Sequence, residues 1–206
     1  MKISELIAAK SNFEDNTKWL PFSVHARDTA GIIKRLFNKW IAENVRRRLC
    51  AAIGIESSGN AEAIVCNYCE FIALVHDIGK LTPAFQRKLK DNIQGLADRL
   101  LDAGIDLSDL THISESPHNI AGQYILKKEF EVAPSTAVIV GAHHGDCSSD
   151  RGQCSYKANY YGHGKVNVNE WTQIRAEWME YALSVTGFED VKNLPNPDIA
   201  AQMLIT

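Results

Sequence analysis

Apolar residues recur at intervals of three and four along most of the chain, which is the spacing that an amphipathic helix requires. The first such run extends from Val24 to Leu49, and Pro21 and Ser23 just before it suit a helix start. Its apolar positions include Ile32, Ile33, Leu36, Phe37, Trp40 and Ile41. The pattern therefore predicts one amphipathic helix over this segment.

Further helical segments are predicted downstream, several of them beginning at or next to a proline, a residue that is common in the first turn of a helix. They cover about 61–77, 83–92, 116–126, 134–144 and 170–185. No convincing alternation of polar and apolar residues predicts a β-strand. We therefore expect an all-α fold, a single bundle-like helical domain.

Composition and charge narrow the class of protein. With 206 residues, 45% of them apolar and 23% charged, the chain fits one ordinary globular domain. No segment reaches the roughly 20 consecutive apolar residues of a membrane helix, and the N-terminus lacks the apolar run of a secretory signal. We therefore expect a cytoplasmic protein without a membrane segment. The net charge of −3 argues against nucleic-acid binding by bulk basicity.

The five cysteines do not predict a disulfide framework, because their number is odd and no export signal precedes them. Cys66 and Cys69 are spaced as C-x2-C, but they lie within an apolar helical pattern and no second pair stands at zinc-ribbon spacing. Burial in the core is the favoured interpretation, and a metal role is the alternative.

Two polar segments are candidates for contact with a nucleic acid. The favoured interpretation of the basic run Arg46-Arg47-Arg48 is a solvated helix face, and contact with phosphate groups is the alternative. Residues 145–169 are rich in Gly, Ser and Asn and directly follow a pair of histidines. Side chains there that offer charge or stacking surfaces to a single strand are Arg151, Lys157, Tyr160, Tyr161 and Lys165. A solvated loop with its aromatic side chains packed on the core is the favoured alternative.

Two neighbouring pairs of residues carry the candidate metal chemistry. His76-Asp77 ends an apolar helical segment, and His143-His144 ends another, between small residues. Neutral imidazole and carboxylate are ligands that suit Mn²⁺, Fe²⁺, Co²⁺, Ni²⁺ and Zn²⁺. The two oxygens of a carboxylate can bridge two cations, which an imidazole cannot do. Lys80 lies about one turn beyond His76, where it can hold a phosphate oxygen.

Two further histidines complete a set of six candidate ligands. His25 lies near the start of one predicted helix and His118 in the first turn of another. Taken singly, each is more often a structural residue, but four segments that all place ligands at helix ends indicate a dinuclear site in a helical bundle. His112 and His163 match no such pattern, and we expect them at the surface.

At these residues the chain resembles a known family. HDIGK at 76–80 resembles the HD superfamily of metal-dependent phosphohydrolases. SVHARDTAGIIKRL, HDIGKLTPAFQRKL, SPHNIAGQYIL and VGAHHG, which begin at 23, 76, 116 and 140, together look like the HD nuclease domain of the CRISPR-associated helicase-nuclease of type I systems. The order and spacing of these segments cover most of the chain.

The resemblance implies a nuclease that degrades single-stranded DNA with two transition-metal ions. It also implies a helicase, in cis or in trans, that supplies the strand displaced by a crRNA-guided targeting complex. By position, His25, His76 and Asp77 would hold one metal ion, and Asp77 would bridge to a second. The ligands of that second ion would be His118, His143 and His144. Lys80 matches a lysine beside the scissile phosphate.

One feature of that family has no counterpart in the sequence. The family carries another metal-binding aspartate in an Ala-Asp-Trp sequence on a late apolar helix, and neither Asp198 nor Asp150 matches it. Residues 198–206 read as the start of such a helix, so we expect 1–206 to be the N-terminal part of a longer chain.

Three other functions fit part of the pattern. A cyclic-dinucleotide phosphodiesterase of the HD type also uses HDIGK and His-His, but that family has a Glu after the His pair, where this chain has Gly145, and a Gly-Tyr-Pro motif. A nucleotidase leaves His118 and the His pair unexplained. A scaffold without catalysis would have no need of six ligand-type residues.

Overall fold

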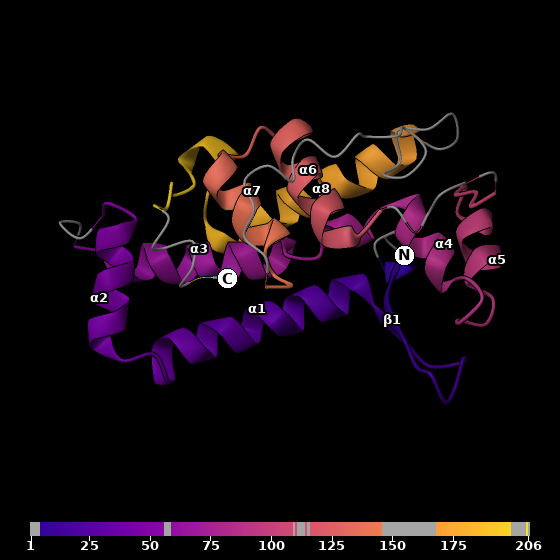
Figure 1. Cartoon of the computed structure of the whole chain (residues 1–206), viewed down its shortest axis with the longest axis horizontal. Coiled ribbons are helices and arrows are strands. Elements are labelled where there is room, and N and C mark those ends of the chain that lie inside the picture. The colour runs from indigo at the N-terminus through magenta and orange to yellow at the C-terminus, as the bar shows by residue number, and fades with distance from the viewer. Residues whose placement is uncertain are drawn as a thin grey trace.

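Helices form most of the chain in the computed structural model, which describes residues 5–55, 59–108, 110, 114, 116–145, 168–198 and 205. Figure 1 labels the helices α1 (Phe22–Lys39), α2 (Glu43–Ala52), α3 (Ala61–Val75), α4 (Pro83–Leu89), α5 (Leu96–Asp102), α6 (His118–Lys128), α7 (Pro134–Gly141) and α8 (Val168–Thr186). The described residues also form two 3-10 helices, η2 (Ile78–Lys80) and η5 (Val191–Asn193), and two strands, β1 (Ala8–Ser11) and β2 (Trp19–Pro21). The expected helical fold class is confirmed.

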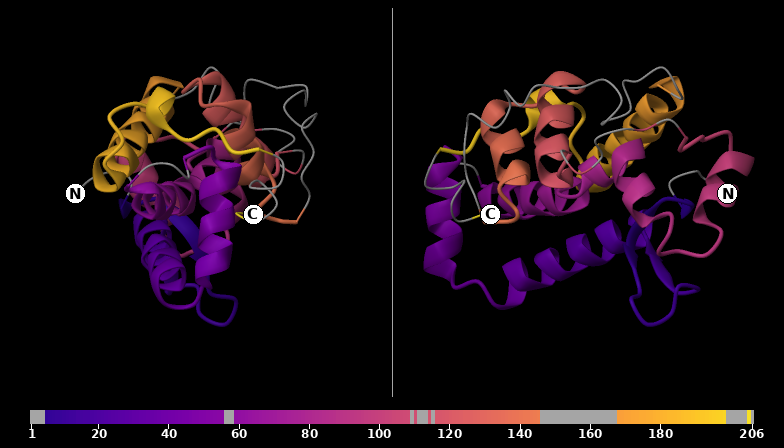
Figure 2. Two further views of the ribbon diagram at one scale, coloured as in Figure 1. Left: turned by 90° about the vertical axis from the view of Figure 1, so that its left-hand side faces the viewer. Right: turned by 45° about the vertical axis from the view of Figure 1, so that its right-hand side comes forward.

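Helix α3 lies at the centre of the molecule. It is apolar on nearly every side, and a helix of that kind is stable in water only when other elements cover it. Helix α1 packs along one side of α3, α7 and α8 pack against it elsewhere, and α2 contacts it as well (Figures 1 and 2). The residues that lead out of the C-terminal end of α3 are therefore held on the best-anchored element of the fold.

The predicted helix from Val24 to Leu49 is wrong in one respect, because the segment forms two helices. α1 ends at Lys39 and α2 begins at Glu43, and α2 turns sharply away from α1 (Figure 1). The turn leaves Trp40 83% exposed and places Leu49 in the core. The local sequence gives no sign of this break, since it contains neither Gly nor Pro; packing of α2 against α3 determines it.

The apolar side of α1 is also only partly buried. Ile32 and Leu36 stay exposed along one wall of a groove of about 330 Å³. Residues of α3, including Ile72 and Ala73, form the facing wall, and His76 lies at the groove as well. The groove therefore runs between α1 and α3 up to the candidate metal ligands.

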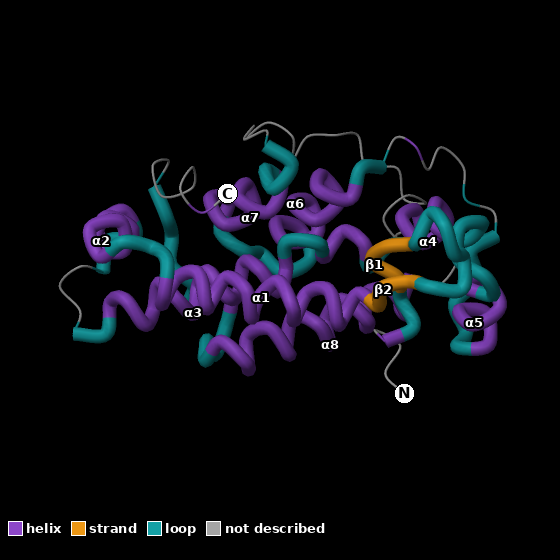
Figure 3. Tube along the Cα trace, turned by 90° about the horizontal axis from the view of Figure 1, so that it is seen from below, coloured by secondary structure: helices purple, strands orange, loops and turns teal. Residues whose placement is uncertain are grey.

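A hairpin and a short helix were not expected from the sequence. β1 pairs with β2 in antiparallel register, with Ala8 opposite Pro21, and the two strands appear in orange in Figure 3. Each strand is too short for an alternating pattern to be visible. Helix α5 begins after Gly95, whose φ of 67° is a left-handed conformation that glycine adopts without strain. β2 leads directly into α1, so the hairpin fixes where that helix starts.

Other expectations concern the surface and the core. Cys66 and Cys69 are buried, as the favoured interpretation predicted, and burial raises the pKa of the Cys69 thiol to about 12. A thiol of that kind stays protonated at neutral pH and is a poor metal ligand. Arg46 pairs with Glu62 at 2.9 Å on an exposed face. Across the described helices, none combines the length and apolar character that a bilayer crossing demands.

Candidate metal centre

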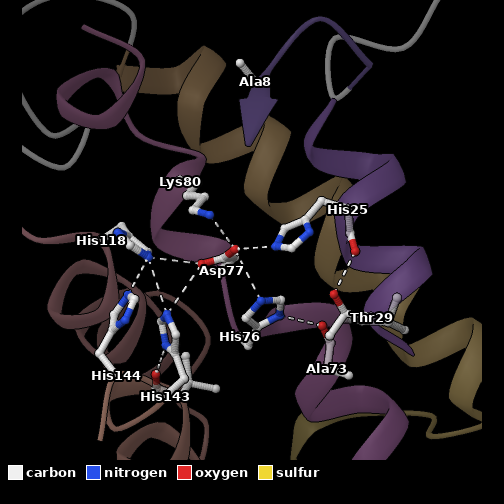
Figure 4. A network of polar contacts seen from close by, with 12 residues as sticks. Ala8, His25, Thr29, Ala73, His76, Asp77, Lys80, His118, His143 and His144 are labelled. Atoms are coloured by element: carbon white, nitrogen blue, oxygen red, sulfur yellow. Dashed lines mark hydrogen bonds and ion pairs between the residues drawn. The ribbon is translucent and has the colours of Figure 1, made fainter. Parts of the chain in front are cut away.

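Asp77 stands between two groups of histidines, and its two oxygens face different groups. Oδ2 lies 2.9 Å from Nε2 of His25 and 3.2 Å from Nε2 of His76. Oδ1 lies 3.1 Å from Nε2 of His118 and 3.5 Å from Nε2 of His143. Figure 4 shows the four rings turned toward the carboxylate, which is itself 2% exposed. The arrangement is that of a carboxylate placed to bridge two sites.

The sixth predicted residue, His144, contacts this group of side chains through His118. Its Nε2 lies 3.0 Å from Nε2 of His118 (Figure 4). The potential ligand atoms fall into two groups, each with members within 4.8 Å of one another. One group is His25, His76 and Asp77, and the other is His118, His143 and His144. All six residues named from the sequence therefore lie together, although they come from four segments.

Close packing of the backbone brings these segments together. A Cβ atom at Gly79 would overlap the carbonyl oxygen of His118 and lie 2.6 Å from the backbone nitrogen of Gly122. Only glycine allows η2 to approach the first turn of α6 this closely. Asn119 then donates from Nδ2 to the carbonyl oxygen of Gly141 at 2.9 Å, which ties α6 to α7. The glycine of HDIGK thus places Asp77 beside His118.

The hydrogen bonds of two rings define which nitrogen faces the centre. Nδ1 of His76 lies 2.7 Å from the carbonyl oxygen of Ala73, and Nδ1 of His143 lies 2.6 Å from that of Val140. A carbonyl oxygen only accepts, so Nδ1 carries the proton in both rings. In the neutral rings Nε2 then presents a lone pair toward an oxygen of Asp77. A nitrogen lone pair and a carboxylate oxygen face each other in this way where a cation lies between them. The nitrogen and oxygen atoms of this site therefore fit metal ions.

Charge at the centre favours the same conclusion. Burial lowers the pKa of His118 and of His144, which keeps both imidazoles neutral and their lone pairs available. Burial opposes ionisation of Asp77, but the close contacts of its carboxylate with the surrounding histidine rings, His118 first, outweigh burial and hold the pKa of that carboxyl well below its usual range. Neutral imidazoles around an ionised carboxylate are the protonation states that metal ligands need.

Lys80 contributes a positive charge at the edge of this centre. Its Nζ lies 2.6 Å from Oδ2 of Asp77, and 5.4 Å from the centre of the Phe85 ring. The side chain is almost fully buried, so it holds its ammonium group close to the carboxylate (Figure 4). A phosphate oxygen brought to the centre would find the ammonium group within reach.

Several buried residues that support the site were not predicted. Arg175 donates to the carbonyl oxygen of Leu81, and Gln86 to that of Lys80. Asn119 donates to the carbonyl oxygen of Gly141, close to the histidine pair. Polar residues in helical segments usually indicate a solvated face, so nothing in their local sequence marks them as buried. Other predicted residues lie outside the described part of the chain: Arg151, Lys157, Tyr160, Tyr161, Lys165, His112 and His163.

A helical bundle in which a His-Asp pair at a helix end meets histidines from three other segments is a metal-binding domain of the HD type. The family described as "Cas3, HD domain" matches residues 9–206. The chain belongs to this family, the HD domain of CRISPR-associated Cas3, as its resemblance implied. Dependence on divalent metal ions is implied for such a domain.

The similar proteins are much longer than this chain. The chain is 33% identical over 210 residues to the CRISPR-associated nuclease/helicase Cas3 of Streptococcus thermophilus. The matched region covers 94% of this chain and 22% of that protein. A crystal structure of a CRISPR-associated protein has a TM-score of 0.75 and 22% identity, over 98% of this chain and 22% of that one. The crystal structure of T. fusca Cas3-ATP has a TM-score of 0.67 and 19% identity, over 98% and 21%. The chain thus spans about a fifth of these relatives, and the two structures support the fold.

Proposed function

We propose that this domain hydrolyses phosphodiester bonds of single-stranded DNA with two divalent transition-metal ions. The observation that carries the proposal is the position of Asp77, whose oxygens each face a separate histidine pair. In the proposed assignment His25, His76 and Asp77 hold one ion. Oδ1 of Asp77 faces His118 and His143, so Asp77 would also contribute to the second position, where His118, His143 and His144 would hold an ion.

The residues of the chain then have distinct roles in the reaction. Divalent cations held by these residues would supply an acidified water and would neutralise the charge that develops on the phosphate. The five imidazoles would hold these cations, and the Asp77 carboxylate lies between the two groups of rings. Lys80 exchanges its contact with Asp77 for a non-bridging phosphate oxygen and stabilises it as a point charge. The exposed His144 marks the side from which substrate enters.

The ligand set also limits the choice of metal. Imidazole nitrogens outnumber carboxylate oxygens in both groups, and nitrogen-rich sites favour Mn²⁺, Fe²⁺, Co²⁺ or Ni²⁺, with Zn²⁺ also accepted. Mg²⁺ prefers oxygen ligands and retains its water, so it is a poor match. We infer that one of the transition metals is the working cofactor.

The partners follow from the family and from the substrate. A helicase, in cis or in trans, would deliver the strand that a crRNA-guided complex displaces, since one relative is by name a nuclease/helicase. In this proposal residues 1–206 form the nuclease domain of a longer cytoplasmic protein. The backbone of an unpaired DNA strand is flexible enough to bend into a site whose walls are helices. Arg151, Lys157, Tyr160 and Tyr161 are proposed to contact this strand.

The proposal is tested by incubating the chain with circular single-stranded DNA and Mn²⁺ or Ni²⁺. We expect nicking of the circle that depends on the metal and stops with a chelator, because the proposed chemistry requires bound cations. A cyclic dinucleotide serves as the competing substrate. Cleavage of the dinucleotide alone would instead support a phosphodiesterase of the cyclic-dinucleotide type. Metal binding without cleavage of either substrate would leave a non-catalytic scaffold.

A further inference from the structure

Gln86 forms an unusual connection between the N-terminal hairpin and the loop of the metal centre. It lies on α4 and its side chain is fully buried. The amide oxygen accepts from the backbone nitrogen of Ala8 at 3.0 Å, and Nε2 donates to the carbonyl oxygen of Ala8 at 2.9 Å. The same nitrogen donates to the carbonyl oxygen of Lys80, also at 2.9 Å. Both N–H groups of the amide are therefore used.

One end of this connection leads to His25. Ala8 belongs to β1, and its neighbour Ile7 accepts a hydrogen bond from the backbone nitrogen of Phe22 at 2.8 Å. Phe22 is the first residue of α1, and His25 follows in the first turn of that helix. By pairing with both backbone groups of Ala8, Gln86 acts on the strand that holds the start of α1 in place.

The other end leads to Asp77 and Lys80. The backbone nitrogen of Lys80 donates to the carbonyl oxygen of Asp77 at 2.8 Å, which closes η2, and Gln86 takes the carbonyl oxygen of Lys80. Thr82 supports the same turn by donating from its hydroxyl to the carbonyl oxygen of Gly79 at 2.8 Å. The backbone that carries the Lys80 side chain is thus held from both sides.

We infer that Gln86 is a positioning residue: it fixes the start of α1 and the backbone of Lys80 relative to each other, and so sets the geometry of His25 and Lys80 around Asp77. The inference rests on the proposed metal centre. Hydrogen bonds of this indirect kind orient ligands, and their removal lowers metal affinity or activity by about 10- to 100-fold. Gln86 itself touches none of the proposed ligand side chains in the described contacts.

The first test measures Mn²⁺ binding by calorimetry, without any nucleic acid. Gln86→Met keeps the volume of the side chain and removes all three hydrogen bonds. Calorimetry on the 206-residue chain gives one affinity for each of the two proposed Mn²⁺ positions. We expect the substitution to lower at least one of these affinities by about 10- to 100-fold relative to wild type. Thr186→Val is the matched control, because it removes a buried hydroxyl that donates to Ala182 within α8, and it should leave the affinity unchanged.

The second test is a double-mutant cycle on the cleavage rate. If Gln86 acts through Lys80, the losses from Gln86→Met and Lys80→Met do not multiply, and the double variant is little slower than Lys80→Met alone. A purely structural role would give losses that multiply. Should Gln86→Met not fold, Gln86→Asn replaces it, since Asn keeps a neutral amide in the buried position but is one methylene too short to span Ala8 and Lys80.

The outcomes separate this inference from the proposed function. The positioning role alone would be overturned by two results together. These are a folded Gln86→Met variant that binds Mn²⁺ with wild-type affinity, and losses of cleavage rate that multiply in the double-mutant cycle. A wild-type chain that binds Mn²⁺ but does not cleave would overturn the nuclease function, while the calorimetric comparison still decides on Gln86. A wild-type chain that binds no Mn²⁺ overturns both.

Discussion

Replacement of Asp77 by alanine should abolish metal-dependent cleavage, with a loss of about 10³-fold or more. Asp77 belongs to one group of potential ligands, with Oδ2 2.9 Å from Nε2 of His25, and its Oδ1 faces the other group, 3.1 Å from Nε2 of His118. Stabilisation of transition-state charge by metal ions contributes several kcal/mol, and about 4 kcal/mol corresponds to roughly 10³-fold in rate. The rate is measured on circular single-stranded DNA with Mn²⁺.

Two further variants sharpen this prediction. Asp77→Asn keeps the shape of the side chain and removes its charge, so a similar loss would assign the effect to charge and not to a cavity. Asp28→Ala removes an exposed carboxylate from the helix that also carries His25, and it should retain the wild-type rate. Wild-type cleavage by Asp77→Asn would mean that another group anchors the metal ions.

Replacement of Arg175 by methionine should destabilise the fold by about 3–5 kcal/mol, a large part of the total for a domain of this size. Arg175 is 0% exposed, and its guanidinium binds both oxygens of Glu129, at 2.7 and 3.0 Å. It also donates to the carbonyl oxygen of Leu81 at 3.0 Å, directly after η2. Loss of the guanidinium leaves the mostly buried Glu129 carboxylate, whose side chain is 9% exposed, without its bidentate partner.

The free energy of unfolding is measured by urea denaturation of the metal-free chain. Glu129→Gln added to Arg175→Met should recover part of the loss, because it removes the buried negative charge. Arg47→Met is the control: Arg47 is exposed and its distance to Glu43 is 3.8 Å, so we expect a change within about 0.5 kcal/mol. A loss below about 1 kcal/mol for Arg175→Met, the value typical of exposed pairs, would contradict this account.

The sequence predicted which residues gather at the candidate metal centre more completely than it predicted the fold around them. His76-Asp77 and His143-His144 end apolar helical segments, whereas His25 and His118 lie near helix starts and became candidates only through the joint occurrence of all four segments. All six residues lie together. The side chain of His76 points to the centre because of a hydrogen bond to Ala73 within the same helix. Local structure of this kind can be inferred from a sequence pattern.

The features that the sequence did not predict depend on distant contacts. The break after Lys39 follows from packing of α2 on α3, and β1 is defined by its pairing with β2 and with Gln86. Arg175 and Gln86 look like ordinary surface residues of amphipathic helices until the partners that bury them are known. Their partners lie 46 and 78 residues away along the chain, at Glu129 and Ala8.

The central claim is that two metal ions lie on either side of Asp77. The most direct test is X-ray diffraction at the manganese absorption edge from crystals grown with Mn²⁺. We predict two anomalous peaks about 3.5–4 Å apart, the separation typical of two-metal sites. One peak should lie beside His25 and His76, and the other among His118, His143 and His144. A single peak, or peaks that do not contact Asp77, would contradict the account.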